Sequence, residues 1–311
     1  MADVNSTFII SLCLIAIGYT LKRIHVLKEE NGVVISKLIF NITLPATILK
    51  FTSNVEIEIS FILLPLITIS FSCIMAVLGL CVFKRYPKRL KGTLIMTMVG
   101  FNIANFSFPL VEGIWGASGM QFITLIDAGN AFSIFVLCYL LGSIFAPKNQ
   151  EEDGSINAKY IINRLVRSVP LISYIIALTI NFSGLVMPIL LTDIIDILAR
   201  ANSALVLLLI GVFLNFKFEK KEWLNILKIL VLRYGIGLTA GILIFTLLPQ
   251  DYFSFLFRII ISISLVLPVG LAVIPFSVEF DYDQKLITML VNLSMIISFV
   301  LLWILVLILN G

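Results

Sequence analysis

Three residues in the stretch 100–130 have the types and spacing to bind an anion inside a membrane. Asn102, Asn105 and Pro109 lie at i, i+3 and i+7, so they share one face if the segment is helical. Pro109 lacks a backbone donor and clashes with the preceding turn, so we expect the helix to kink or break near it. Polar groups and broken backbone persist at membrane depth only where protein buries them or a watery cavity opens. The stretch predicts half of a transport site; the alternative for both amides is hydrogen bonding between helices.

Asp127 is an ionisable residue in the next apolar segment, and Asn130 follows it on the same helical face. Asp127 lies about seven residues into a helix over 120–145, roughly 10 Å deep at ~1.5 Å per residue. An ionisable residue at that depth is a functional-site hypothesis by default. We expect Asp127 to carry a coupling proton or, with Asn130, to hold a cation. The alternative is a helix that begins later, with Asp127 at the membrane interface.

Pro268 and Pro275 give the second half of the chain a matching feature. They are seven residues apart in SLVLPVGLAVIPFSVEF and share a face, while Gly270 adds conformational freedom. Pro/Gly-interrupted helices in corresponding positions of two halves are a pointer to a transport site, where freed amides face an anion. We therefore expect Pro109 and Pro268 to mark a crossing point and Pro275 a second break. Simple proline kinks are the alternative.

Several other residues are weaker candidates. Asn41 and Pro45 are four residues apart on one face and are predicted to line the same cavity, unless they form only a satisfied kink. Asn292 corresponds in the second half to the region of Asp127, with packing as the alternative role. Arg233 and Lys50 lie within reach of the interfaces, where we expect them to snorkel. The alternative is that an anion carrier uses either residue as a counter-charge.

The composition predicts the fold class. Hydrophobic residues make up 60% of the 311-residue chain and charged residues 13%, with a mean hydropathy of +1.10. A soluble domain is nearer half apolar and a quarter charged, so we expect an all-α polytopic membrane protein. The single histidine, His25, lies in a charged loop, and the four cysteines show no metal or disulfide spacing. A histidine-based metal site is thereby disfavoured, and no nucleic-acid-binding feature is present.

Hydropathy predicts ten transmembrane helices, since each needs about 20 mostly apolar residues. The first apolar run lacks the flanks of a cleavable signal peptide and is read as a helix that stays. Counts of nine or eleven remain open on hydropathy alone. The ten ranges are 5–22, 36–54, 59–83, 92–112, 120–145, 165–186, 196–216, 225–248, 257–278 and 286–309.

The distribution of basic residues predicts the orientation. Of the 22 Lys and Arg residues, 18 fall in the loops 22–37, 84–91, 146–167, 217–228 and 279–285. The positive-inside rule places these loops in the cytoplasm and both termini outside the cytoplasm. We expect a multi-pass protein of the cell (plasma) membrane.

The polar linker 151–164 divides the chain into five helices in 1–150 and five in 165–311. Because each half has an odd number of helices, the second half enters the membrane in the opposite orientation. This is the topology of an inverted repeat, with helices four and nine, which carry Pro109 and Pro268, in corresponding positions.

The order and spacing of several motifs resemble one transporter family. They are GYTLKRIHVL, SKLIFNITLPATIL, GFNIANFSFPLVEGIWGASG, LVLLLIGVFL and LPVGLAVIPFSVEFDYDQ. The chain resembles bacterial members of the auxin efflux carrier family, which includes malate permease-like proteins and plant auxin exporters. The resemblance implies broken helices four and nine that cross near the midplane, as in sodium/proton antiporters and bile-acid/sodium symporters. It also implies organic-anion transport. The family commonly has a Gly close before the helix-four Pro, where this chain has Phe106, Ser107 and Phe108.

These features together predict a secondary active transporter of small organic anions, such as malate, that works by alternating access. Helices three to five and eight to ten would move relative to helices one, two, six and seven. No GxxxxGK[ST] loop is present, so we expect no cofactor and energy from an H⁺ or Na⁺ gradient, the membrane potential or the substrate's own gradient. An enzyme is disfavoured because HExxH and GxSxG motifs are absent. A channel or a ligand-sensing protein on the same scaffold is the alternative, and a homodimer is left open.

Overall fold

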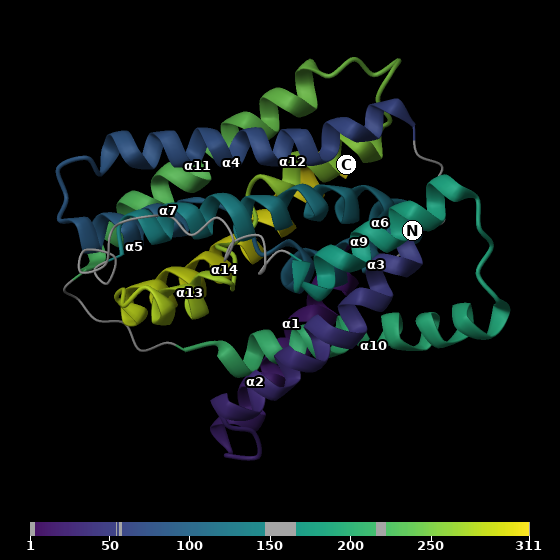
Figure 1. Ribbon diagram of the computed structural model, residues 1–311, viewed down its shortest axis with the longest axis horizontal. Coiled ribbons are helices and arrows are strands. Elements are labelled where there is room, and N and C mark those ends of the chain that lie inside the picture. Colours follow the sequence, from purple (N-terminus) through teal and green to yellow (C-terminus); the bar gives the residue numbers. More distant parts are fainter. Residues whose placement is uncertain (1–3, 54, 56–57, 147–165, 216–221, 311) are drawn as a thin grey trace.

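The structure is a computed structural model that describes residues 4–53, 55, 58–146, 166–215 and 222–310 (Figure 1). The described residues form helices, joined by turns and one isolated antiparallel bridge. In the first half these are α1 Val4–Arg23, α2 Glu29–Leu38, η1 Ile39–Thr43, α3 Leu44–Thr52, η2 Ile59–Ile62, α4 Leu63–Val82, α5 Lys88–Met98, η3 Ile103–Ser107, α6 Phe108–Phe132, η4 Ser133–Cys138 and α7 Tyr139–Ile144. In the second half they are α9 Val169–Ser183, α10 Ile189–Phe213, α11 Trp223–Leu247, α12 Phe255–Ser264, α13 Val273–Glu279 and α14 Gln284–Asn310.

By length and apolar composition, seven helical segments of the described residues can cross a membrane, which confirms a polytopic membrane protein. They are Val4–Arg23, Glu29–Thr52, Ile59–Val82, Ile103–Ile144, Ile189–Phe213, Trp223–Leu247 and Gln284–Leu309. The number differs from ten for identifiable reasons. Ile103–Ile144 runs on for 42 residues through two predicted spans, while α9 and α12 are shorter apolar helices of 15 and 10 residues. The predicted linker 151–164 lies outside the described residues, and the two-repeat division stays a prediction.

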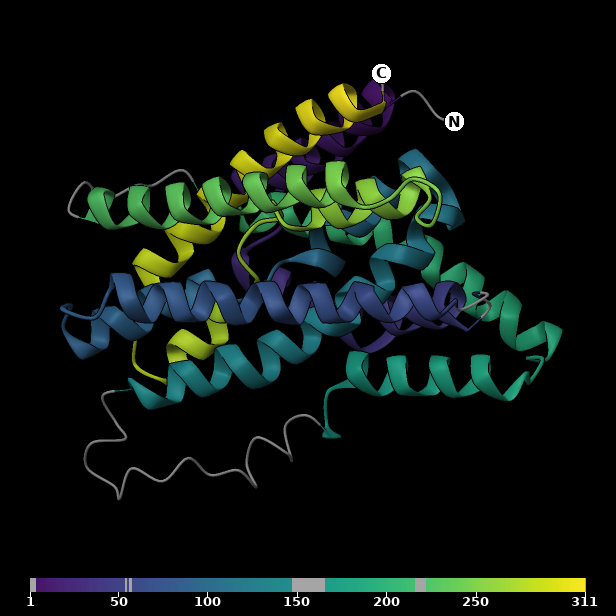
Figure 2. The ribbon, with the colours of Figure 1, turned by 90° about the horizontal axis from the view of Figure 1, so that it is seen from above.

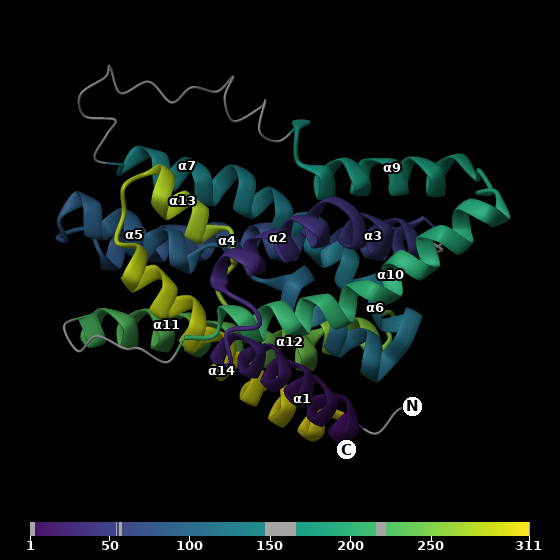
Figure 3. The same cartoon turned by 90° about the horizontal axis from the view of Figure 1, so that it is seen from below.

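The helices pack as two groups (Figures 2 and 3). We call α1, α2–η1–α3, α9 and α10 the flanking group, because α10 packs along α1, α2 and α3. The remaining helices form the core group, in which α4, α5, α6 and α7 pack against one another and α11, α12 and α14 join them. The two groups meet where α1, α3, α9 and α10 contact α6.

Both chain ends lie on the same side of the molecule, beside the contact between α1 and α14 (Figure 2). The Trp303 indole donates a 2.9 Å hydrogen bond to Asn5 Oδ1 there, and the Trp303 ring stacks on Phe8. Large aliphatic side chains are exposed along the outer faces of α1, α4, α9, α10, α11 and α14. An apolar exterior of this extent is what lipid contact requires.

Glycines set the closest helix contacts. A Cβ at Gly237 would lie 2.3 Å from the Leu265 carbonyl oxygen, and a Cβ at Gly241 would lie 2.7 Å from that of Ser262. The small-xxx-small pattern of α11 therefore lets it approach α12 closely, as its sequence predicts.

Candidate functional site

The first helix interruption lies between α5 and η3. Val99 is extended, Gly100 has a φ of +78° and Asn102 is non-helical, with φ −88° and ψ 71°. A Cβ at Gly100 would also lie 2.6 Å from the Ile134 side chain, so this position requires glycine in both conformation and space.

The prediction that the helix breaks at Pro109 is wrong, because the interruption lies before η3. Pro109 is the second residue of α6, seven residues after Asn102, and the chain is helical on both sides of it. A proline inside a helix removes one backbone hydrogen bond, so the turn before it must adapt. The π-helix η3 precedes it and changes the hydrogen-bond register, while the Ser107 hydroxyl bonds the Ile103 carbonyl at 2.9 Å.

The second interruption separates α12, which ends at Ser264, from α13, which begins at Val273. Pro268 lies within it, as predicted. Pro275 is the third residue of α13, so the predicted second break at Pro275 is wrong. A proline in the first turn of a helix costs little, because the amide that it lacks would have no partner there.

The two interruptions meet at an antiparallel bridge between Phe101 and Val269. The Asn102 amide donates a 2.9 Å hydrogen bond to the Pro268 carbonyl. Residues more than 160 positions apart thus form a crossing of two unwound segments, each with a half-helix on either side.

Arg233 of α11 holds this crossing together, and its predicted snorkelling to an interface is wrong. Its side chain is fully buried, and the guanidinium carbon lies 4.4 Å from the centroid of the Phe101 ring. The guanidinium donates to five carbonyl groups, those of Thr97, Met98, Gly100, Leu267 and Pro268, at 2.7–3.3 Å. Helix ends leave carbonyls without partners and carry partial negative charge. A fixed cation therefore satisfies both interruptions at once.

Lys50, by contrast, pairs with Asp196 of α10 at 3.2 Å and stays partly exposed. Its position near a membrane interface stays a prediction.

The Asn130 side chain provides hydrogen-bond partners for backbone groups of the first interruption. Its Oδ1 accepts from the Phe101 amide at 2.7 Å, and its Nδ2 donates to the Phe101 carbonyl at 2.8 Å. Asn130 therefore pairs with Phe101 as a neighbouring strand would, which leaves its amide oxygen committed to Phe101.

Asp127 is buried beside this pair. The alternative of a helix that begins later is wrong, because α6 already begins at Phe108. Its carboxylate accepts from Asn130 Nδ2 at 3.2 Å and from the Tyr174 hydroxyl of α9 at 2.8 Å. The Ala104 backbone amide, at the start of η3, also interacts with it. A carboxylate at a half-helix N-terminus is favourably placed against the helix dipole.

Asn102 and Asn105 reach the same region but keep polar atoms without partners. Both side chains are at least 95% buried, and neither Asn102 Nδ2 nor Asn105 Oδ1 has a hydrogen-bond partner among the described residues. An unpartnered buried polar group carries a substantial desolvation cost, so each one calls for an explanation. Here an unfilled donor and an unfilled acceptor lie at the N-terminal start of the half-helix η3–α6.

The remaining sequence candidates lie elsewhere or act differently. Asn41 is exposed and bonds the Lys37 carbonyl of its own helix, so the prediction that it lines the cavity is wrong. Asn292 is buried on α14 near two serines that serve the second interruption. The Ser294 hydroxyl accepts from the Val269 amide at 3.0 Å, and Ser298 donates to the Val266 carbonyl at 2.7 Å.

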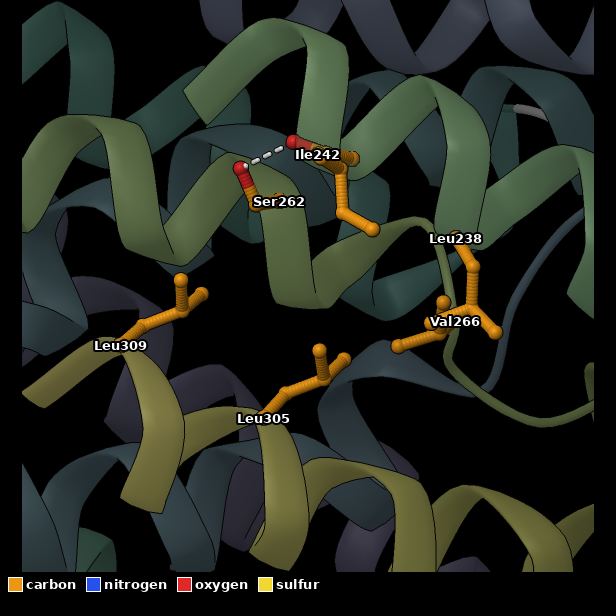
Figure 4. A pocket seen from close by; sticks show the side chains of 7 residues that line it. Leu238, Ile242, Ser262, Val266, Leu305 and Leu309 are labelled. Atoms are coloured by element: carbon orange, nitrogen blue, oxygen red, sulfur yellow. Dashed lines mark hydrogen bonds between the residues drawn. The ribbon is translucent and has the colours of Figure 1, made fainter. Parts of the chain in front are cut away.

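Two hollows in the surface are separate from the crossing's polar groups. An apolar crevice of about 10 Å³ between α11, α12 and α14 is lined by Leu238, Ile242, Leu305 and neighbouring residues (Figure 4). It has room for about one water, and its one polar side chain, Ser262, already donates to the Gly241 carbonyl. A wider hollow of about 520 Å³ follows the helix-distorting Gly116 and is lined by Glu112 and Trp115. No cluster of three metal-ligating His, Cys, Asp or Glu side chains occurs in the part of the chain that the structure describes.

A crossing of two interrupted membrane helices, with a buried carboxylate beside it, is an architecture for moving solutes. A model of the membrane transport protein family matches residues 6–306. The chain belongs to this family. The match confirms the auxin efflux carrier-like resemblance of the motifs.

An uncharacterized transporter of Methanocaldococcus jannaschii is 25% identical over 260 residues, which cover 79% of this chain and 77% of the relative. One of Methanothermobacter thermautotrophicus is 24% identical over 304 residues, 95% of each chain. Membership in the membrane transport protein family points to a transporter rather than an enzyme.

Two residues of the site were misjudged or missed from the sequence. The sequence favours an interface position for Arg233, with a counter-charge as the alternative, although a charged residue inside an apolar helix is by default a functional signal. Tyr174 was not singled out. A tyrosine within an otherwise apolar helix needs a partner for its hydroxyl, and that need was the available signal.

Proposed function

We propose that the protein is a secondary active transporter of small organic anions, with a carboxylate such as malate as the substrate. One observation carries the proposal: Asn102 and Asn105 hold unfilled hydrogen-bonding atoms, buried at the start of a half-helix. The Asn102 Nδ2 group is a donor, and carboxylate oxygens accept. Asn102 is the N-terminal flanking residue of η3, where the helix dipole favours negative charge.

Arg233 supports an anion for a second reason. Its charge is partly offset by five carbonyls, but no acidic side chain of the described residues forms a salt bridge with it. A positive charge therefore lies within the crossing. Asp127 supplies the opposite charge nearby and is the candidate site for a coupling cation, H⁺ or Na⁺.

The transport cycle would follow from the two helix groups. The core group carries the crossing, and alternating access would move it against the flanking group. We propose ten spans in two inverted repeats in the plasma membrane, with the basic loops in the cytoplasm. Both termini would then lie outside the cytoplasm, which agrees with their position on one side of the molecule (Figure 2).

Several polar contacts between the groups lie toward that side. Thr7 donates to the Gly113 carbonyl at 3.2 Å, and Ser203 donates to Glu112 at 2.6 Å. By contrast α5 and α13, on the opposite side of the crossing, pack within the core group.

Counterflow in proteoliposomes tests the proposal. Labelled malate should accumulate when unlabelled malate is inside, and Asn102→Ala should slow this exchange about tenfold or more because a charged ligand loses a donor. Asn225→Ala is the matched control, since Asn225 bonds Glu222 at the start of α11. Its exchange should equal that of the wild type.

Two outcomes would contradict the proposal. Absence of exchange across a panel of small carboxylates would exclude an organic-anion carrier. Conductance without stimulation by internal substrate would indicate a channel. A thermal-shift screen of the same acids, with and without sodium and at several pH values, would show binding independently of transport.

A further inference from the structure

Tyr174 forms a deep polar contact between the two helix groups. It belongs to α9 in the flanking group, its side chain is only 2% exposed, and its hydroxyl donates to Asp127 Oδ2 at 2.8 Å. Asp127 belongs to α6 in the core group. A single hydrogen bond therefore joins a helix of one group to an ionisable residue of the other.

This hydrogen bond continues into the crossing. Asp127 Oδ1 accepts from Asn130 Nδ2, and Asn130 pairs with both backbone groups of Phe101. Phe101 is the residue that bridges to Val269 of the second interruption. A continuous polar chain thus runs from α9 through the carboxylate to the unwound backbone.

Three other side-chain hydrogen bonds between the groups, among the described residues, differ from it in their acceptors or burial. Thr7 bonds a main-chain carbonyl, Trp303 bonds an amide, and Ser203 bonds Glu112, which is partly exposed. Around Asp127, Tyr174 is the titratable side chain in contact, whereas Asn130 and the Ala104 amide do not titrate. Arg233 is engaged by the carbonyls of the crossing.

We propose that Tyr174 is a positioning residue that makes the relative movement of the two helix groups depend on the charge of Asp127. The inference rests on the proposed transport function and adds the device that couples it. A hydrogen bond to an ionised carboxylate is about twice as strong as one between neutral groups. A cation on Asp127, whether H⁺ or Na⁺, offsets that charge and weakens the bond from Tyr174. The flanking group is then released from the core group only when the cation is present.

Tyr174→Phe tests the proposal because it removes the hydroxyl and keeps the ring. We expect substrate exchange to persist while its dependence on the coupling cation is lost. In practice, the ratio of exchange rates at low and high pH, or with and without sodium, should fall to about one, since the charge-assisted bond no longer opposes movement. Separate pH and sodium series identify which cation acts.

Tyr234→Phe is the matched control. Tyr234 is also a buried tyrosine, and its hydroxyl bonds the Ser294 carbonyl and Ser298 Oγ within the core group. It loses a buried hydroxyl bond without breaking a link between groups, so its cation dependence should equal that of the wild type. Wild-type dependence in Tyr174→Phe, or its loss in both variants, would overturn the inference.

A second measurement covers the case in which Tyr174→Phe does not fold. Hydrogen exchange of α9 in the wild type should quicken as the coupling cation is added, and Asp127→Asn should show the faster exchange without it. Unchanged α9 exchange in both experiments would overturn the inference. Wild-type protein that fails to exchange any carboxylate would contradict the proposed function instead, so the two failures are distinguishable.

Discussion

At the scale of single residues, the site is organised by side chains that substitute for missing backbone. Asn130 supplies a donor and an acceptor to Phe101, and Arg233 supplies donors to five carbonyls of both interruptions. In a bilayer water cannot fill these roles, so the protein must. Asn102 and Asn105, like Arg233 Nε, each keep a buried atom unfilled at the crossing. The proposed function assigns the two asparagine side chains to the substrate.

Arg233→Gln should destabilise the protein by at least about 3 kcal/mol, because several buried carbonyls lose a charged donor. Arg233→Lys should cost less but still more than a surface change, since an ammonium offers three donors and no planar face for Phe101. Thermal unfolding in detergent measures both.

Arg258→Gln is the matched control for this prediction. Arg258 is also a buried arginine over a phenylalanine ring, but it donates to one carbonyl, that of Phe245. Its substitution should cost clearly less than that of Arg233. Equal losses would mean that the carbonyl cluster contributes nothing beyond burial of an arginine.

At the scale of elements, the sequence predicted that helices four and nine are interrupted but misplaced one interruption. Proline marks the break correctly at Pro268, which lies in the break itself. It does not at Pro109 and Pro275, which lie inside the half-helices that follow. The break at Gly100 is fixed by Asn130 and Arg233, which lie 29 to 133 residues away in sequence. Such tertiary contacts are not visible in local spacing. Asp127 and Asn130 were found because their i, i+3 spacing is local.

Helix contacts in the core group also depend on absent side chains. Gly129 of α6 faces the backbone of Pro65 in α4, and a Cβ there would lie 2.5 Å from the Pro65 carbonyl oxygen. Because backbone cannot move aside as a side chain can, Gly129→Ala should destabilise the protein by about 1–3 kcal/mol.

Gly235→Ala is the corresponding control on α11, where a Cβ would meet nothing within 4 Å. Alanine has the higher helix propensity, so this variant should be neutral or slightly more stable. The comparison uses melting temperatures in one detergent. A Gly129→Ala protein as stable as Gly235→Ala would show that α4 and α6 are not packed this closely.

At the scale of the whole molecule, the distribution of basic residues and the arrangement of the helices together predict the orientation in the membrane. The loop 84–91 carries five basic residues, whereas the turn between α11 and α12 carries Asp251 and no basic residue. These two regions lie at opposite ends of the core group (Figure 1). The positive-inside rule then places the basic end in the cytoplasm and the end with both termini outside.

Cysteine labelling tests this orientation. In a background without Cys13, Cys73, Cys81 and Cys138, Asp251→Cys should react with a membrane-impermeant maleimide added to intact cells. Lys84→Cys should react only after permeabilisation, because its loop is cytoplasmic. Both positions are exposed, so reagent access is limited by the membrane and not by packing. The reverse labelling pattern would invert the topology. Labelling of both positions in intact cells would require an even number of spans between them. The ten-span arrangement places five spans there, so this result would contradict the predicted number of spans.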